Sequence, residues 1–303
     1  CIHHFIPERR FTSGKATFRD YNFKTPTAKM EADQSGSGAY EHADKELYDY
    51  PGRYEAQGGG KSLIKVRMEG EEALDRRCMG AGNCVTLFAG SLVKLSGHPF
   101  ESYNVEYALI RAQHSFISQQ YRSGAGSAGE DSYEGQYEFA KSKNPFQPMQ
   151  VTPRPLMHGP QTAFVVGKEG EEIDCDEYGR ILVRFHWDRK SDQSMRCRVA
   201  QNWGSKQWGG MIIPRIGMEV MVEFLEGDPD RPLVTGCVYN AGSMPPATLP
   251  LYKTRSTFKS QSHKRDGSNE LRFEDEGGEE EVYLHAQKYL NAVVEDNETW
   301  LIG

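Results

Sequence analysis

The sequence lacks any long apolar run, and no stretch approaches the roughly 18 residues that a helix needs to cross a bilayer. We therefore expect a soluble chain, and its 303 residues are enough for two or three domains with buried cores. An initiating methionine is also missing, because the sequence opens on Cys1. We expect further residues upstream of Cys1, and no signal peptide is visible.

Cysteine is scarce, with six residues in 303, and no two of them form a Cys-x-x-Cys pair. Scattered single cysteines are not typical of a disulfide framework, so we expect reduced thiols in a protein made in the cytoplasm. Cys237 lies in an apolar segment and is predicted to fill a core.

The motifs of common enzyme and metal sites are absent as well. There is no His-Glu-x-x-His sequence, no Gly-rich phosphate loop with Lys and no Gly-x-Ser-x-Gly elbow. His3 and His4 are adjacent, so their side chains point apart on an extended chain. Glu281 and His285 are four residues apart in a strand-like segment, which separates them by about 13 Å. We therefore predict no catalytic residue, no cofactor site and no metal site, and a protein that is not an enzyme.

Charge is unevenly distributed, although the net charge is −7. Residues 180–215 hold eight Lys or Arg against two Asp, whereas residues 216–303 hold sixteen acids against eight bases. The two regions are expected to attract each other, or neighbouring copies of the chain. The basic region also carries aromatic residues that would suit single-stranded nucleic acid: Phe185, Trp187, Trp203 and Trp208. Because Phe185 and Trp187 share an apolar face with Ile181 and Val183, we expect both inside a barrel, which favours a basic surface for an acidic protein over nucleic-acid binding.

Residues 144–245 are predicted to form a small β-barrel. Every second residue from 181 to 187 is apolar, which is the period of a half-buried strand. Val220, Val222 and Phe224 alternate with polar neighbours, and the EGDPDRP run at 226–232 has the Gly and Pro residues of a tight reversal. A further apolar strand follows it. Several short strands over about 75 residues are typical of an OB-fold.

Residues 1–143 are predicted to be rich in strands. Apolar and polar residues alternate at 64–68 and at 105–109. A short helix is expected at 71–78, ended by the glycines that follow. Exposed loops are predicted at two glycine-rich stretches, residues 58–60 and 123–129.

Residues 246–303 contain too few apolar residues to build a core alone. Strands are predicted at 271–273 and 282–286, separated by an acidic turn at 274–281. We therefore expect this part to become ordered by winding together with identical chains.

Five motifs occur in the order found in a known family: residues 159–163 (GPQTA), 177–180 (EYGR), 185–188 (FHWD), 213–220 (IPRIGMEV) and 225–232 (LEGDPDRP). They resemble the VgrG spike proteins of bacterial type VI secretion, which are related to the hub and spike proteins of contractile phage tails. The resemblance is strongest between residues 144 and 289 and continues more weakly upstream.

This resemblance implies a mainly β fold in three parts. These are a phage tail-hub-like β-barrel region at 1–143 that is incomplete at its N-terminus, an OB-fold spike domain at 144–245, and the neck and start of a trimeric β-helical needle at 246–303. It also implies a homotrimer that caps the secretion tube, punctures target-cell envelopes and carries effectors. The implied partners are a hexameric Hcp-like tube protein, a PAAR-type tip protein and secreted effectors, and the protein would leave the cytoplasm by type VI secretion.

Two other functions fit parts of the pattern. One is an OB-fold module that binds an oligonucleotide or a glycan, and the other is a phage tail-spike protein. A phage puncturing device of similar build carries a muramidase between barrel and needle. Here only residues 240–252 connect the two parts, which is too short for a catalytic domain, so hydrolysis is not expected.

Overall fold

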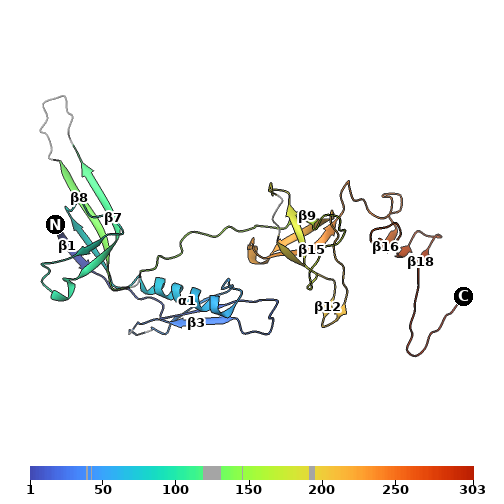
Figure 1. Cartoon of the computed structure of the whole chain (residues 1–303), viewed down its shortest axis with the longest axis horizontal. Coiled ribbons are helices and arrows are strands. Elements are labelled where there is room, and N and C mark those ends of the chain that lie inside the picture. The colour runs from blue at the N-terminus through green and yellow to red at the C-terminus, as the bar shows by residue number, and fades with distance from the viewer. Residues whose placement is uncertain (39, 42, 119–130, 145, 191–194) are drawn as a thin grey trace, which may run out of the picture. The chain divides into compact units, whose positions relative to one another are not determined.

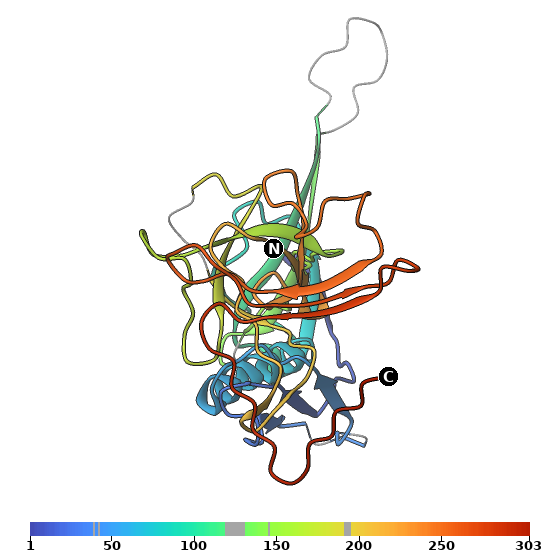
Figure 2. The same ribbon diagram turned by 90° about the vertical axis from the view of Figure 1, so that its right-hand side faces the viewer.

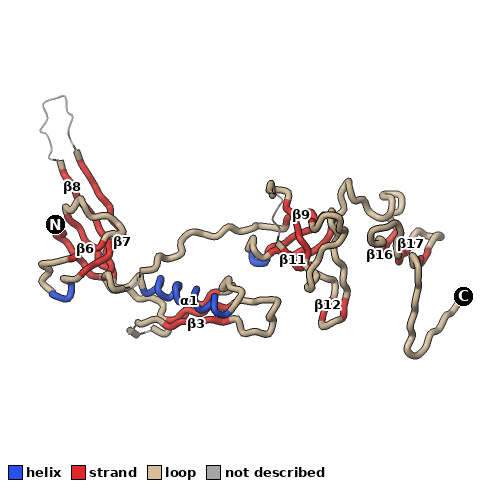
Figure 3. Tube along the Cα trace, viewed as in Figure 1, coloured by secondary structure: helices blue, strands red, loops and turns tan. Residues whose placement is uncertain are grey.

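The computed structural model describes residues 1–38, 40–41, 43–118, 131–144, 146–190 and 195–303. The chain divides into two compact units, Cys1–Thr152 and Pro153–Gly303. Strands, drawn red in Figure 3, are the main regular secondary structure of both units, and loops connect them. Within the described residues, no helix combines the length and the apolar character that crossing a membrane requires.

The first unit contains a five-stranded antiparallel sheet in the order β1-β5-β8-β7-β6. Its strands are β1 (Ile2–Pro7), β5 (Arg77–Gly82), β6 (Leu92–Lys94), β7 (Glu106–Ile117) and β8 (Ser132–Lys141). The strands β7 and β8 form the long hairpin seen in Figure 1. The core of the sheet is aromatic, because Tyr107, Tyr137 and Phe139 are buried on one face together with Leu109.

A second lobe of this unit packs helix α1 (Gln57–Glu72) against a small sheet in the order β3-β2-β4 (Figure 1). The strands are β2 (Lys15–Arg19), β3 (Glu31–Ser35) and β4 (Glu46–Asp49). Ile64 and Met68 of α1 are buried against Ala16 and Ala32 of the sheet. The two helix residues are four apart and therefore share one face of the helix.

Three predictions for this unit are wrong. The expected strand at 64–68 lies inside α1, and the expected loop at 58–60 is its first turn, where Gly60 packs so tightly on Tyr54 that a Cβ would lie 2.7 Å from the ring. Alternation over five residues did not distinguish a strand from a helix, because Ile64 and Met68 fit both periods and Val66 is exposed. The expected helix at 71–78 is instead the end of α1, a turn and the start of β5.

Two further predictions for this unit can be compared with the structure. The strand predicted at 105–109 is confirmed as part of β7. The loop predicted at 123–129 lies outside the described residues.

The second unit contains a closed five-stranded barrel in the order β10-β11-β15-β14-β9, which confirms the predicted OB-like barrel. Its strands are β9 (Gln161–Val166), β10 (Ile181–Phe185), β11 (Arg196–Val199), β14 (Glu219–Phe224) and β15 (Pro232–Val238). A short hairpin of β12 (Gly204–Ser205) and β13 (Trp208–Gly209) is inserted between β11 and β14. The core consists of small and branched residues contributed by all five strands: Ala163, Val165, Ile181, Val183, Cys197, Val220, Val222 and Val234.

The reversal predicted at 226–232 is confirmed as a short 3-10 turn, Leu225–Gly227. Glu226 and Gly227 have φ values of 55° and 67°, and the Asp228 amide donates to the Leu225 carbonyl oxygen at 3.1 Å. The left-handed backbone at Gly227 explains the glycine at this position.

The predictions for Trp187 and Cys237 are wrong. Strand β10 ends at Phe185, so the apolar alternation stops two residues before Trp187, which is 63% exposed. Its indole Nε1 donates to Gln161 Oε1 at 2.9 Å, and its ring stacks on the half-buried Phe185 at 5.2 Å. Cys237 is exposed, and Val234 is the one buried residue among the seven of β15.

The final sheet, which we call the neck sheet, has the order β16-β17-β18 and is antiparallel. Its strands are β16 (Arg255–Lys259), β17 (Glu270–Glu274) and β18 (Glu281–His285), seen side by side in orange and red in Figure 2. The strands predicted at 271–273 and 282–286 and the acidic turn between them are confirmed. Strand β16 was not predicted. The domain limits at residues 143 and 245 stay a prediction.

The different environments of Phe185 and Trp187 lead to the first prediction. Phe185→Ala should cost about 3 kcal/mol, because its ring packs on the barrel core. Trp187→Ala should cost about 1 kcal/mol, because it removes an exposed stacking partner. Calorimetric unfolding of the full chain measures both, and equal losses for the two variants would contradict this description of the barrel.

Candidate functional site

The neck sheet has an apolar face that none of the described residues covers. Phe258 lies opposite Leu271, which in turn lies opposite Leu284, and a second row joins Phe273 to Val282. The exposed fractions of Phe258, Leu284 and Val282 are 64%, 61% and 71%. Adjacent apolar side chains on three strands therefore form one continuous exposed surface, which is typical of an interaction site.

The opposite face of the neck sheet is charged and largely satisfied within the chain. Three cross-strand ion pairs span it: Arg255–Glu274 at 2.7 Å, Arg272–Glu281 at 2.6 Å and Lys259–Glu270 at 3.6 Å. The Arg272 guanidinium also lies over the Tyr283 ring at 4.3 Å. Glu274 is only 8% exposed, and the Thr254 hydroxyl and then Arg255 lower the pKa of its carboxyl. The sheet thus pairs its charges with one another and exposes its hydrophobic residues, the reverse of a sheet in a soluble monomer.

A set of polar contacts, which we call the barrel–neck clamp, holds the neck on the barrel. Arg215 Nη1 lies 3.2 Å from Glu172 Oε2, and Arg215 Nη2 donates to the Gln261 carbonyl oxygen at 2.5 Å. The Lys264 amide donates to Glu172 Oε1 at 3.0 Å, and Lys264 Nζ pairs with Glu171 at 3.0 Å. Two barrel loops therefore bind the loop that joins β16 to β17 through hydrogen bonds and an ion pair.

A cluster at the barrel surface has the residue types of a catalytic triad but not the geometry. Thr162 Oγ1 lies 2.8 Å from His186 Nε2, and Glu219 Oε1 lies 3.9 Å from the same nitrogen. A triad needs the carboxylate on the other ring nitrogen, where it orients the base. Asn240 Nδ2 donates instead to Glu219 at 2.7 Å, and this bond, followed by Thr162, lowers the pKa of the Glu219 carboxyl. The cluster anchors the segment that leaves the barrel.

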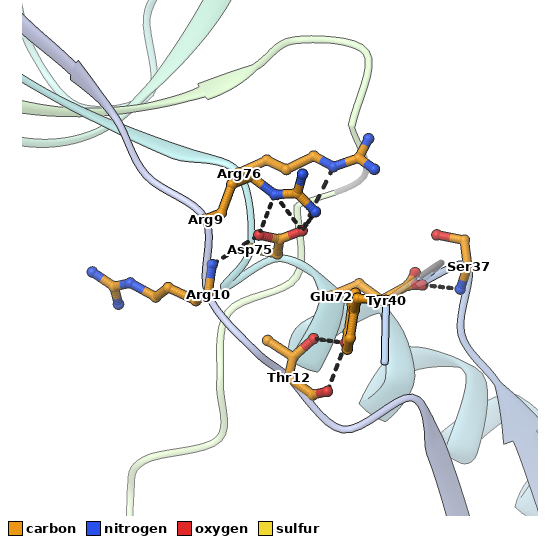
Figure 4. A network of polar contacts seen from close by, with 8 residues as sticks. All are labelled: Arg9, Arg10, Thr12, Ser37, Tyr40, Glu72, Asp75 and Arg76. Atoms are coloured by element: carbon orange, nitrogen blue, oxygen red, sulfur yellow. Dashed lines mark hydrogen bonds and ion pairs between the residues drawn. The ribbon is translucent and has the colours of Figure 1, made fainter. Parts of the chain in front are cut away.

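A polar cavity of about 110 Å³ lies in the first unit, at the junction of its two lobes (Figure 4). Asp75, just after α1, accepts hydrogen bonds from Arg9 Nε at 3.0 Å and from the Arg10 amide at 2.9 Å. Across the cavity the Tyr40 hydroxyl donates to the Thr12 carbonyl oxygen at 2.6 Å. Figure 4 shows that the contacts of Asp75 with Arg9 and Arg10 join the segment after β1 to the end of α1, while Tyr40–Thr12 and Ser37–Glu72 are separate contacts.

The acidic end of α1 explains why arginines from other segments gather here. Glu71, Glu72 and Asp75 lie at the C-terminal end of the helix, where the dipole disfavours negative charge, and the last turn carries no basic residue. Arg9 balances the negative charge of Asp75 through an ion pair, and the Arg77 side chain donates a hydrogen bond to the Ala73 carbonyl oxygen. Burial acts to raise the pKa of the Asp75 carboxyl, but the hydrogen bonds from Arg9 and from the backbone outweigh it, and its pKa lies below the ordinary value.

The histidines considered for metal binding are not part of a ligand set in the described structure. The rings of His3 and His4 are 5.3 Å apart and meet edge to face. Glu281 pairs with Arg272, whereas His285 at the other end of β18 stacks on Tyr283. Among the residues that the structure describes, no group of three or more His, Cys, Asp or Glu residues has the arrangement of a metal site.

Sequence reasoning found part of the apolar face and missed the rest. It located β17 and β18 from their alternation, but β16 carries one large apolar residue, Phe258, among polar neighbours and gave too weak a signal. The contacts of the barrel–neck clamp join residues that are 43 to 93 positions apart in the sequence, and the Asp75 contacts join residues 65 to 66 positions apart. No local pattern predicts such pairs.

Family models match three segments of the chain. Residues 1–120 match the phage tail baseplate hub, residues 161–239 match the type VI secretion and phage-baseplate injector OB domain, and residues 256–303 match the C-terminal trimerisation domain of bacteriophage T4 gp5. The third match covers the neck sheet except for Arg255, the first residue of β16, and includes the exposed apolar face.

Curated relatives match nearly the whole chain. The type VI secretion system spike proteins VgrG1b and VgrG1a of Pseudomonas aeruginosa are 41% and 40% identical over 302 residues. Each alignment covers 97% of this chain but 41% and 47% of the relative, so the chain spans less than half of their length. A chain in the solved structure of a half-lidded Francisella PdpA–VgrG complex also matches. The alignment covers 94% of this chain and 52% of that chain. The TM-score is 0.52 and the sequence identity is 8%, so the match supports the fold.

The contacts of Asp75 lead to the second prediction. Because the folded state lowers the pKa of Asp75, its ion pair stabilises the protein above the ordinary value of 3.8, and this contribution is lost as pH falls through the folded value. Asp75→Asn should lower the stability of the first unit at pH 7 by about 1 kcal/mol, at the low end for charged hydrogen bonds because Arg9 is exposed.

Thermal unfolding at pH 7 and at pH 3 measures this effect. The difference between Asp75→Asn and wild type should shrink at pH 3, whereas the exposed Asp49→Asn should match wild type at both. A difference that stays the same at the two pH values would contradict the role given to the Asp75 carboxylate.

Proposed function

This chain is a homologue of the VgrG spike proteins and belongs to their family, and on that premise we propose that it is a structural part of a type VI secretion spike. Three copies assemble through the neck sheet into a stiff, pointed object that caps the secretion tube and is driven through a target-cell envelope. The role is mechanical and needs no catalytic residue.

The observation that carries this proposal is the uncovered apolar face of the neck sheet. Burying one Val, Leu or Phe side chain stabilises an assembly by about 1.5–3 kcal/mol, and five such side chains lie together on this face. Three copies around a threefold axis give each face an apolar partner, while the charged faces stay in contact with water. The match of residues 256–303 to a trimerisation domain supports this arrangement.

The other parts of the chain fit a spike that connects several partners. The first unit, which matches a baseplate hub over residues 1–120, serves as the base that sits on a hexameric Hcp-like tube protein. Beyond the neck a needle carries a PAAR-type tip protein, and effectors travel on the spike. The solved PdpA–VgrG complex is an example in which a VgrG protein is found with another protein.

A second candidate is an OB-fold that binds single-stranded nucleic acid, and one observation favours it. Trp187, Trp203 and Trp208 are all more than half exposed, so they are available for base stacking. The net charge of −7 opposes it, because phosphates are repelled. Affinity for single-stranded DNA that falls steeply with salt would favour this candidate over the spike.

The third prediction tests the spike through its neck. Native mass spectrometry of the full chain should give a trimer. Leu284→Lys should abolish the trimer, because it introduces a charge into the apolar face, and His285→Lys should leave the trimer intact, because it introduces the same charge on the opposite face. A monomeric wild type, or equal loss of trimer in both variants, would contradict the proposal.

A further inference from the structure

A hairpin on the barrel displays two tryptophan rings. Gly204 pairs with Gly209 and Ser205 with Trp208, so Trp203 and Trp208 flank a tight turn. Their rings meet edge to face with centroids 4.9 Å apart, a geometry that is favourable for aromatic pairs. We call residues 203–212 the tryptophan hairpin.

The tryptophan hairpin is held rigidly at its base. The Gln201 side chain accepts from the Ile212 amide and donates to the Ile212 carbonyl oxygen, both at 2.9 Å. Gly209 has a φ of 128°, and a Cβ there would lie 2.5 Å from the Trp203 carbonyl oxygen. A Cβ on Gly210 would lie 2.1 Å from Asn202 Oδ1. These glycines allow close backbone packing, which presents the two rings in one fixed arrangement.

The surface of the hairpin is apolar and open. Trp203, Trp208, Met211 and Ile212 are 66%, 54%, 80% and 53% exposed. Between residues 200 and 214 Lys206 is the one charged residue. A rigid, uncharged group of large apolar side chains with paired aromatic rings has the composition of a binding hot spot.

The geometry of the second unit points to a neighbouring copy of the chain as the occupant. The barrel ends at Val238, β16 begins at Arg255, and the barrel–neck clamp holds the loop after β16 directly on the barrel. Three neck sheets that share one axis therefore hold three barrels beside one another. In a closed threefold ring each barrel offers one surface to the copy on one side and a different surface to the copy on the other.

We propose that the tryptophan hairpin of each copy docks on the barrel of the next copy and forms a second trimer contact, separate from the neck. This inference rests on the proposed trimer and names a surface that holds the barrels together. The neck provides the intertwined contact, and the hairpins fix the barrels against rotation around the axis.

Photo-cross-linking tests which surface the hairpin meets. A benzoylphenylalanine in place of Trp208 in the full chain should produce cross-linked dimers and trimers on a denaturing gel, with cross-linked peptides from residues 153–245. The same group in place of Tyr178, a barrel residue that is 48% exposed, is the matched control and should cross-link less. Cross-links confined to one chain, or directed to residues 1–152, would overturn the inference.

A second measurement, which is also the fourth prediction, separates this inference from the proposed function. In sedimentation, Trp203→Ser combined with Trp208→Ser should keep the fold by circular dichroism but raise the concentration at which the trimer dissociates at least tenfold. A variant that dissociates like a trimeric wild type would overturn the hairpin contact and leave the spike proposal standing. A wild type that never forms a trimer would contradict the spike itself.

Discussion

The constraint on which the rest of the structure depends is the inverted neck sheet. Its charges satisfy one another across β16, β17 and β18, so the chain gains little by bringing that face against another surface. Its apolar side chains stay largely exposed in the part of the chain that the structure describes. Because water disfavours exposed apolar surface and tolerates paired charges, the sheet can lower its free energy mainly by meeting more apolar surface. The exposed residues of the sheet thus favour contact with further apolar surface.

The barrel differs from the neck sheet because it buries its apolar side chains within its own core. All five barrel strands contribute to one closed core, and closure leaves no strand edge unpaired. The barrel therefore buries its core within one chain, and it can serve as a support for the neck sheet. The contacts of Arg215 and Glu172 with the loop after β16 connect the barrel to the neck sheet, whose apolar face is exposed.

The sequence predicted well where a local pattern has one structural meaning. Alternation at Val220 and Val222 and the glycine at 227 identified a strand and its reversal, because a half-buried sheet and a left-handed turn leave specific residue signatures. Prediction failed where the period was ambiguous, as at Ile64 and Met68 in α1, or where the end of an element decided burial, as at Trp187. The tryptophan hairpin was visible only as two aromatic residues, because its rigidity comes from contacts of Gln201 and of two glycines.

The acidic end of α1 has a consequence for how the two lobes of the first unit depend on each other. A helix with Glu71, Glu72 and Asp75 at its negative pole is a poor autonomous structure, and the compensating Arg9 precedes Asp75 by 66 residues. Arg67 pairs with Glu71 within the helix, but Asp75 gains the Arg9 ion pair only when that long loop closes. The C-terminal end of the helix is therefore tied to the N-terminal segment, so a change in either one is felt by both lobes.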